Sequence, residues 1–116
     1  MKYLCLVYLD EARLDELPDA DCVAYDREIR ESGHCVASEA LQSVHTATTV
    51  RIRNGKLGIT DGPFAETKEQ LGGYYQIDVP DLDTALRYAQ MIPAIDYGTI
   101  EIRPVMDVGP LLAMAG

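Results

Sequence analysis

The chain is poor in the residues that hold metals or form disulfide frameworks. Its three cysteines, Cys5, Cys22 and Cys35, are odd in number and form no C-x-x-C pair, and it has only two histidines. This spacing matches neither a disulfide scaffold nor a zinc site. No G-x-G-x-x-G stretch joins a strand to a helix, which argues against a dinucleotide site. We therefore expect no metal, no cofactor, and free thiols in a reducing compartment such as the cytoplasm.

Positive charge is scarce as well. Ten Lys and Arg residues stand against nineteen Asp and Glu residues, a formal net charge of −9, and the basic residues are scattered. Binding to a phosphate backbone needs clustered Lys and Arg, so we expect no nucleic-acid partner. The apolar run 3–9 is too short for a signal peptide or a membrane span. We expect no membrane partner, and a cytoplasmic location.

Length and periodicity predict the order of elements. A chain of 116 residues is expected to form a single domain over 1–116. Runs of apolar residues, turn residues and helical spacing predict strands over 3–9, 34–41, 72–79 and 99–105, a helix over 19–32 ended by Gly33, and a second helix from 80 that Pro93 ends. The tail 106–116 shows no clear pattern.

The dipeptide Asn54-Gly55 lies between two β-rich runs and predicts a hairpin. Both central residues of a type I′ turn need positive φ, which Asn and Gly accept. A two-residue loop pairs 53 with 56 and, by extension, 48 with 61. Since side chains alternate, the same register puts Asp61 on the face that is otherwise apolar. The residues that share this face with Asp61 are Val50, Ile52, Leu57 and Ile59.

The order β-α-β, an inserted β-hairpin, then β-α-β predicts an α+β fold, a ferredoxin-like sandwich with both helices on one sheet face. The other face would expose apolar side chains. A monomer rarely exposes so much apolar sheet, so we expect a homodimer that covers this face with a second protomer. The residues expected on the uncovered face are Tyr3, Cys5, Val7, Tyr74 and Gln76.

The stretch 61–75 concentrates ionisable groups beside backbone-permissive residues, just after the hairpin. Asp61 is the leading candidate for an acid or base, because a carboxylate beside Val50, Ile59 and Phe64 would be partly desolvated. The alternative is a turn residue whose carboxylate accepts backbone N–H bonds. Glu66 and Lys68 are either catalytic partners or a solvated ion pair. The pair 72–73 is better explained by backbone geometry or close approach than by phosphate binding.

Other candidates lie outside that stretch. Tyr25, on the inner stripe of the first helix, either contacts a substrate or belongs to the core. His34 either contacts a substrate or is a turn residue. Ala37, Ser38 and Ala40 are small, which suggests close approach by a helix or a ligand. Ser38 has no nucleophile-elbow context, so we do not expect a nucleophile there.

Blocks across nearly the whole chain resemble the DGPF family, a branch of the YCII-related proteins. The signature is Asp61-Gly62-Pro63-Phe64. The blocks that carry the resemblance are 1–6, 33–34, 40–43, 46–49, 61–64, 66–69, 71–73 and 101–104. The resemblance implies a dimeric α/β-barrel protein, a cytoplasmic homodimer with a small pocket. Members of the wider group resemble enzymes with a His–Asp pair or lactone isomerases. The helix histidine of those enzymes has no counterpart here, where the stripe offers Tyr25.

Together these patterns favour a small-molecule enzyme that works by isomerisation, elimination or hydrolysis. The expected catalytic residues are Asp61, Glu66 and Lys68. The expected substrate-binding residues are Tyr25, His34, Phe64, Glu69 and Tyr74. The alternative is a non-catalytic ligand-sensing or protein-interaction module. The resemblance favours this alternative too, because such proteins often accompany extracytoplasmic-function sigma factors, which would provide a regulatory protein partner.

Overall fold

The structure, a computed structural model, describes residues 1–115; Gly116 lies outside the described residues. Its strands are β1 (Lys2–Leu9), β2 (Cys35–Ala40), β3 (Thr48–Arg53), β4 (Lys56–Asp61), β5 (Gln70–Asp78) and β6 (Gly98–Pro104). Its α-helices are α1 (Asp19–Glu31), α2 (Leu82–Gln90) and α3 (Gly109–Ala115). Three short 3-10 helices are η1 (Glu11–Glu16), η2 (Val44–Thr46) and η3 (Pro93–Asp96). Every expected strand and helix is present, within a few residues of its expected bounds.

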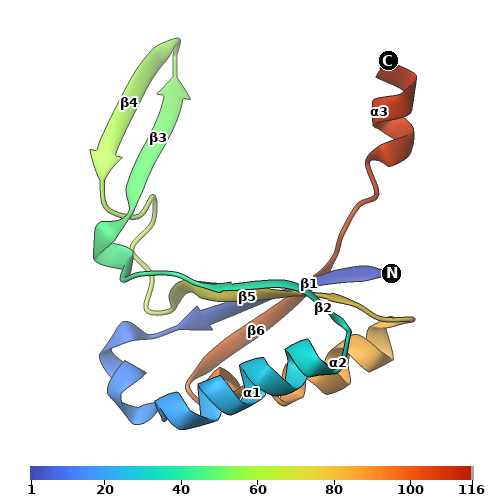
Figure 1. Cartoon of the computed structure of the whole chain (residues 1–116). Helices are drawn as coiled ribbons and strands as arrows, with labels where there is room; N and C mark the ends of the chain where they lie inside the picture. The colour runs from blue at the N-terminus through green and yellow to red at the C-terminus, as the bar shows by residue number, and fades with distance from the viewer. Residues whose placement is uncertain (116) are drawn as a thin grey trace.

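The main sheet has the strand order β2-β5-β1-β6, and all its neighbours are antiparallel. Helices α1 and α2 cover one face, as Figure 1 shows. This is the ferredoxin-like α+β sandwich that the order of elements predicted. Gly33 ends the α1 segment with φ of 81°, the left-handed conformation expected there. Within residues 1–115, no helix is long and apolar enough to cross a membrane.

The core lies between the sheet and the two helices. Tyr3, Cys5 and Val7 are buried there, together with Tyr25 and Ile29 of α1. Our expectation that these three β1 residues lie on the uncovered face was therefore wrong. The strand is apolar on both faces, so its alternation alone could not show which face meets the helices. Burial also raises the pKa of the Cys5 thiol to about 11, which keeps it protonated.

The opposite face of the main sheet has no helix on it. Leu4 pairs with Gln76 and Leu6 with Tyr74, and alternation directs all four away from the helices. All four are half-buried. Tyr74 and Gln76 thus lie on the uncovered face, as expected. The second protomer expected to cover this face stays a prediction.

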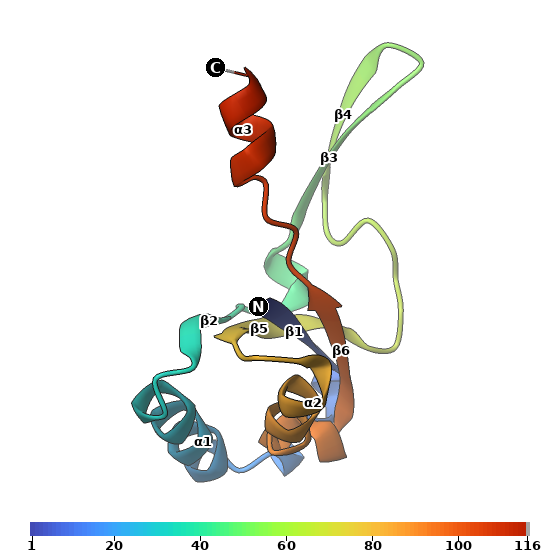
Figure 2. The same cartoon turned by 90° about the vertical axis from the view of Figure 1, so that its right-hand side faces the viewer.

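The hairpin β3–β4 has the register that Asn54-Gly55 predicted, from the pair Arg53–Lys56 to the pair Thr48–Asp61. Asn54 and Gly55 have φ of 52° and 74°, as a type I′ turn requires. The hairpin forms its own two-stranded sheet and rises from the side of the main sheet that faces away from the helices (Figure 2).

Helix α3 rises on the same side, and the sequence pattern did not predict it. A proline is tolerated in the first turn of a helix, so Pro110 after Gly109 did not exclude one. The helix has no buried residue. Without a buried face its apolar residues follow no core-facing period, which is why the tail showed no pattern.

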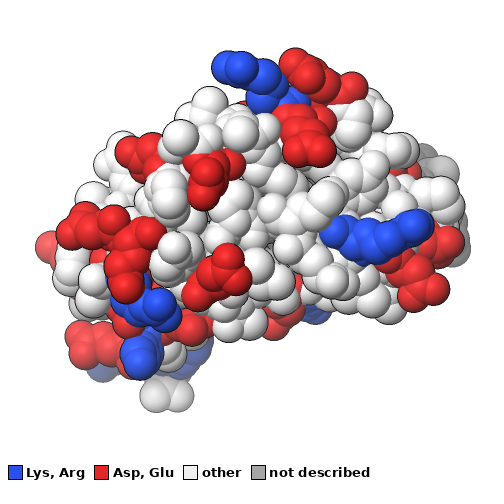
Figure 3. Space-filling view, turned by 90° about the horizontal axis from the view of Figure 1, so that it is seen from below, with Lys and Arg blue, Asp and Glu red and all other residues white. Residues whose placement is uncertain are grey.

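Charge on the helix-covered side agrees with an acidic chain. Figure 3 shows this side, where Asp and Glu outnumber isolated Lys and Arg residues around an uncharged centre. No continuous basic patch is visible on it. The expected lack of a nucleic-acid surface stays a prediction, to which this view is favourable.

Candidate functional site

A cavity of about 580 Å³ opens between α1, η1, η3 and the β2–β5 side of the main sheet. Apolar side chains form most of its wall: Val7, Leu9, Leu14, Leu17, Val23, Leu41 and Ile92. This size and composition are those of a small-molecule site. We call it the α1–β2 cavity.

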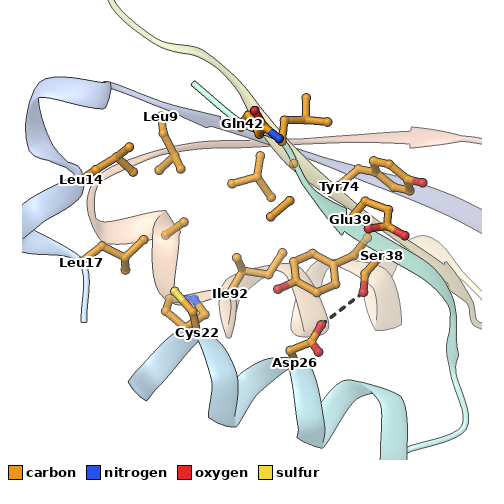
Figure 4. Close-up of a pocket in the computed structure, with 18 of the residues that line it drawn as sticks. Leu9, Leu14, Leu17, Cys22, Asp26, Ser38, Glu39, Gln42, Tyr74 and Ile92 are labelled. Carbon is orange, nitrogen blue, oxygen red and sulfur yellow. Dashed lines mark hydrogen bonds between the residues drawn. The ribbon is translucent and has the colours of Figure 1, made fainter. Parts of the chain in front are cut away.

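A polar cluster interrupts the apolar wall where α1 faces β2. The Arg30 guanidinium donates to Asp26 Oδ2 at 2.9 Å from Nε, and to Ser38 Oγ at 2.6 Å from Nη2. The Ser38 hydroxyl in turn donates to Asp26 Oδ1 at 3.2 Å, the dashed line in Figure 4. All three residues line the cavity. The Asp26 side chain keeps 41% of its surface exposed, so its carboxylate remains accessible despite these hydrogen bonds.

Helical spacing explains half of this cluster. Asp26 and Arg30 are four residues apart on α1, where side chains of one face meet. Ser38 comes from β2 and is 8% exposed, one of the small residues in that strand. Its hydroxyl is satisfied on both sides, by the Arg30 donor and the Asp26 acceptor. A buried hydroxyl held this way positions the carboxylate rather than moving freely.

Tyr75 of β5 adds a second hydroxyl to the lining of the cavity. Its ring meets the ring of Tyr25 edge-on, with centroids 5.2 Å apart. Burial, and then the negative charge of Asp26, raise the pKa of Tyr75 to about 12. The hydroxyl therefore stays protonated near neutral pH and offers a hydrogen-bond donor.

Two glycines let the strands close around the cavity. A Cβ on Gly73 would lie 2.7 Å from the Glu39 carbonyl oxygen of β2, and a Cβ on Gly72 would lie 3.0 Å from the Leu9 side chain. Both glycines line the cavity. The close approach expected here is confirmed: Gly73 meets the backbone of β2, and Gly72 meets a side chain of β1.

One carboxylate of the cavity wall joins η1 to the segment after β2. Glu11 of η1 accepts from the Val44 amide at 2.5 Å and from the Ser43 hydroxyl at 2.9 Å. These hydrogen bonds hold the pKa of Glu11 below its usual range, the bond to Val44 most of all. Glu11 and Ser43 both line the cavity. The link fixes η1 to the segment that leads into the hairpin.

The structure does not bring Asp61, Glu66 and Lys68 to this cavity. All three are exposed, and they lie in and after β4. The face that Asp61 shares with Val50 and Ile59 is open in the single chain, where these two side chains are 62% and 66% exposed. The partial desolvation expected for Asp61 is not seen in the described single chain, where the residue is exposed. A catalytic role for these three residues stays a prediction and needs a second chain over that face.

The turn after Asp61 is held by other groups. The Gly62 amide donates to the Ala47 carbonyl at 2.7 Å, and the Thr49 hydroxyl donates to the Gly62 carbonyl at 2.8 Å. Gly62 takes φ of 106°, which favours glycine. Across residues 1–115 the Asp61 carboxylate accepts no hydrogen bond, so the alternative in which it caps the turn is wrong.

Of the five expected substrate-binding residues, Tyr74 is among the residues around the cavity, but its side chain lies on the face of the sheet opposite α1. The Tyr25 hydroxyl donates to the Tyr88 carbonyl at 3.0 Å and the residue is buried, so the core alternative describes it. His34 Nδ1 lies 3.2 Å from the Asp78 carbonyl oxygen, beside the Tyr88 ring.

The remaining two lie after the hairpin. The Phe64 side chain is 80% exposed. Glu69 accepts from the Thr99 hydroxyl at 2.7 Å, which ties the loop before β5 to β6. Neither is among the residues that line the α1–β2 cavity. Their role in binding stays a prediction.

Sequence reasoning missed Asp26, Arg30 and Tyr75. The i, i+4 spacing of Asp26 and Arg30 was a visible signal, but it is also the spacing of an ordinary surface ion pair. The small residues of β2 did indicate close approach at Ser38. Only the fold shows that these signals meet at one cavity.

These features define an α+β domain of ferredoxin-like fold with a small-molecule cavity beside its first helix. The sequence matches the YCII-related domain family over residues 1–109, and the chain belongs to that family. An uncharacterised protein of Rhizobium meliloti (strain 1021) is 37% identical over 114 residues, which cover 90% of this chain and 92% of that protein.

A solved structure of the same fold is the 5-chloro-2-hydroxyhydroquinone dehydrochlorinase TftG of Burkholderia phenoliruptrix AC1100, in complex with 2,5-dihydroxybenzoquinone. The two structures superpose with a TM-score of 0.54, covering 91% of this chain and 94% of TftG. Sequence identity is 11%, so the similarity concerns the fold alone.

Proposed function

We propose that this protein binds a small, largely apolar molecule in the α1–β2 cavity and acts on it by proton transfer. The observation that carries the proposal is the Asp26–Arg30–Ser38 cluster in the wall of an otherwise apolar cavity. A few convergent polar groups in an apolar pocket are the usual form of a substrate site. The reaction classes that fit are isomerisation, elimination and hydrolysis.

Each polar group has a role in this scheme. The Asp26 carboxylate is the base that accepts a proton from the substrate, or from water in a hydrolysis. Arg30 and Ser38 hold its two oxygens in place, so Ser38 is a positioning residue and not a nucleophile. The protonated Tyr75 hydroxyl donates to a substrate oxygen. TftG shows that an elimination occurs on this fold.

The wider setting is also part of the proposal. The Asp61-Gly62-Pro63-Phe64 motif supports placement in the DGPF branch, and the uncovered sheet face supports a homodimer. The free thiols Cys22 and Cys35 support a cytoplasmic location. In such a dimer, a second chain would cover Asp61, and its role as acid or base with Glu66 and Lys68 can then be tested.

The alternative is a ligand-sensing or protein-interaction module that turns nothing over. The exposed apolar hairpin favours it, since such surfaces serve protein contacts. In this case the cavity would bind a ligand. The partner would be a regulatory protein, such as a sigma factor. Turnover of a bound compound separates the two functions.

The test is a panel of small aromatic and alicyclic acids, lactones and phenols, screened by thermal shift. A ligand at 100 times its Kd stabilises a protein by about 2.7 kcal/mol, roughly 10 °C in Tm for a chain of this size. Each hit is then incubated with the protein and followed by mass spectrometry and NMR. A changed product supports the enzyme, and unchanged ligand supports the sensing module.

Two asparagine variants make the test specific. Asp26→Asn keeps the size of the side chain and should abolish turnover. Asp21→Asn is the matched control, because Asp21 is exposed on the same helix and does not line the cavity. Equal turnover by Asp26→Asn and the wild type would refute the assignment of the base. Loss of turnover in Asp61→Asn alone would move the site to the hairpin.

A further inference from the structure

The hairpin β3–β4 and helix α3 are two projections with apolar surfaces that meet nothing in the single chain. Both rise from the side of the main sheet that faces away from α1 and α2 (Figures 1 and 2). On the hairpin, Ile52 and Leu57 are each 64% exposed. On α3, Leu112 is 66% and Met114 is 84% exposed. We call these projections the arms.

The size of the exposed surface indicates what covers them. The chain exposes 8280 Å², whereas a compact monomer of this length exposes about 6,300 Å². Its radius of gyration is 16.7 Å, against about 13 Å for a compact domain of this length. The excess of about 2,000 Å² per chain, doubled for a pair, falls in the range of obligate homodimers, about 2,000–5,000 Å². A second chain could cover an excess of this size.

Charge favours a second copy of this acidic chain as the partner. The hairpin carries Arg51, Arg53 and Lys56 on its polar face and Asp61 as its one acid, a charge of +2. The net charge of the chain is −9, so the residues outside the hairpin carry a charge of −11. These basic side chains lie on the face opposite Val50 and Ile59, so they attract the acidic body of a second chain from a distance, while the apolar face makes the contact.

We propose that the arms clasp a second copy of this chain, so that each protomer's hairpin and α3 pack against the flanks of its partner. This inference rests on the proposed homodimer, not on the chemistry of the cavity. Packed sheets lie about 10 Å apart. A strand of six residues extends about 20 Å, so the hairpin reaches past the partner's sheet to its helix layer. The Val50–Ile59 face, with Asp61 at its base, then becomes part of the interface.

Sedimentation equilibrium over a concentration series tests the clasp with two neighbouring variants. Ile59→Asp and Thr60→Asp add the same charge on opposite faces of β4, and both residues are exposed in the single chain. Ile59→Asp should raise the dimer dissociation constant at least tenfold, because one buried isoleucine is worth about that factor or more. Thr60→Asp should change it less than about threefold. Equal constants for the two variants would overturn the clasp.

Hydrogen exchange of the wild-type protein gives a readout that needs no variant. Dilution of the protein from above to below the dimer dissociation constant should speed amide exchange in residues 50–59 and 109–115, together with β1. A dimer whose arms exchange equally at both concentrations would overturn the clasp and leave the sheet-to-sheet dimer. A wild-type chain that stays monomeric would overturn both. The thermal-shift screen tests the cavity separately, so neither result decides whether the cavity binds a ligand.

Discussion

Replacing Gly73 by alanine should destabilise the protein more than the same replacement at Gly72, the other glycine of this pair in the cavity lining. The new Cβ would lie 2.7 Å from the Glu39 carbonyl oxygen and 3.3 Å from the Ala40 Cα. Both atoms belong to the backbone of β2, so relief requires moving a strand by several tenths of an ångström. Overpacking of this kind costs about 1–3 kcal/mol, and we expect Gly73→Ala near the upper end of that range.

Gly72→Ala is the control. Its Cβ would meet Leu9 Cδ1 at 3.0 Å, the mobile end of a side chain that can turn aside. We expect a cost below about 1 kcal/mol, within the range of a tolerated repacking. The two variants add the same group at consecutive positions, so differences in unfolded-chain entropy cancel.

Urea unfolding followed by circular dichroism measures both variants. Gly73→Ala should lower the midpoint with an unchanged slope, and its Tm should fall by roughly 10 °C or more. Similar midpoints for the two variants would show that β2 moves freely. The explanation that Gly73 is required by its close contact with the β2 backbone would then be wrong.

The remaining predictions concern single side chains. Glu11→Gln should weaken the loss of stability at acid pH. The folded-state pKa of Glu11 is lowered, so the ionised carboxylate contributes to the free energy of unfolding near neutral pH. That contribution is lost as pH falls through the folded-state pKa. Urea midpoints at several pH values check this, and an unchanged acid limb would contradict it. Tyr25→Phe removes the hydroxyl bonded to the Tyr88 carbonyl and should cost about 1 kcal/mol, with ligand thermal shifts unchanged; a lost ligand shift would place Tyr25 in the site. Asp61→Ala should change the free energy of unfolding by less than about 0.5 kcal/mol, as for surface sites, because Gly62 and Thr49 hold the turn; a loss of 1 kcal/mol or more in urea would show that the carboxylate supports the turn.

Local signals in the sequence predicted the fold well. Asn54-Gly55 specified the hairpin register pair by pair, because the type I′ turn leaves no freedom in a two-residue loop. The order of elements specified the ferredoxin-like topology. The faces of β1 were not predictable in the same way, since both carry apolar residues and only the helices decide which face is buried.

The site was harder to predict because it depends on contacts between distant residues. Asp26 and Ser38 are twelve positions apart, and Tyr75 is farther still along the chain. Their meeting depends on how α1 lies on the sheet. The stretch after Asp61 drew attention because it concentrates ionisable residues. In the structure several of these side chains lie on an exposed turn.

The connection between β2 and the hairpin links the cavity to the arms. Residues 41–43 line the cavity, and the chain passes directly from them through η2 into β3. A ligand that holds 41–43 in one position therefore also restricts the base of the hairpin. Thermodynamic linkage is reciprocal, so any factor by which a cavity ligand tightens docking of the hairpin is the factor by which docking tightens the ligand. We therefore expect a cavity ligand to change the dissociation constant of the proposed dimer through residues 41–43, and dimer formation to change the affinity for the ligand by the same factor.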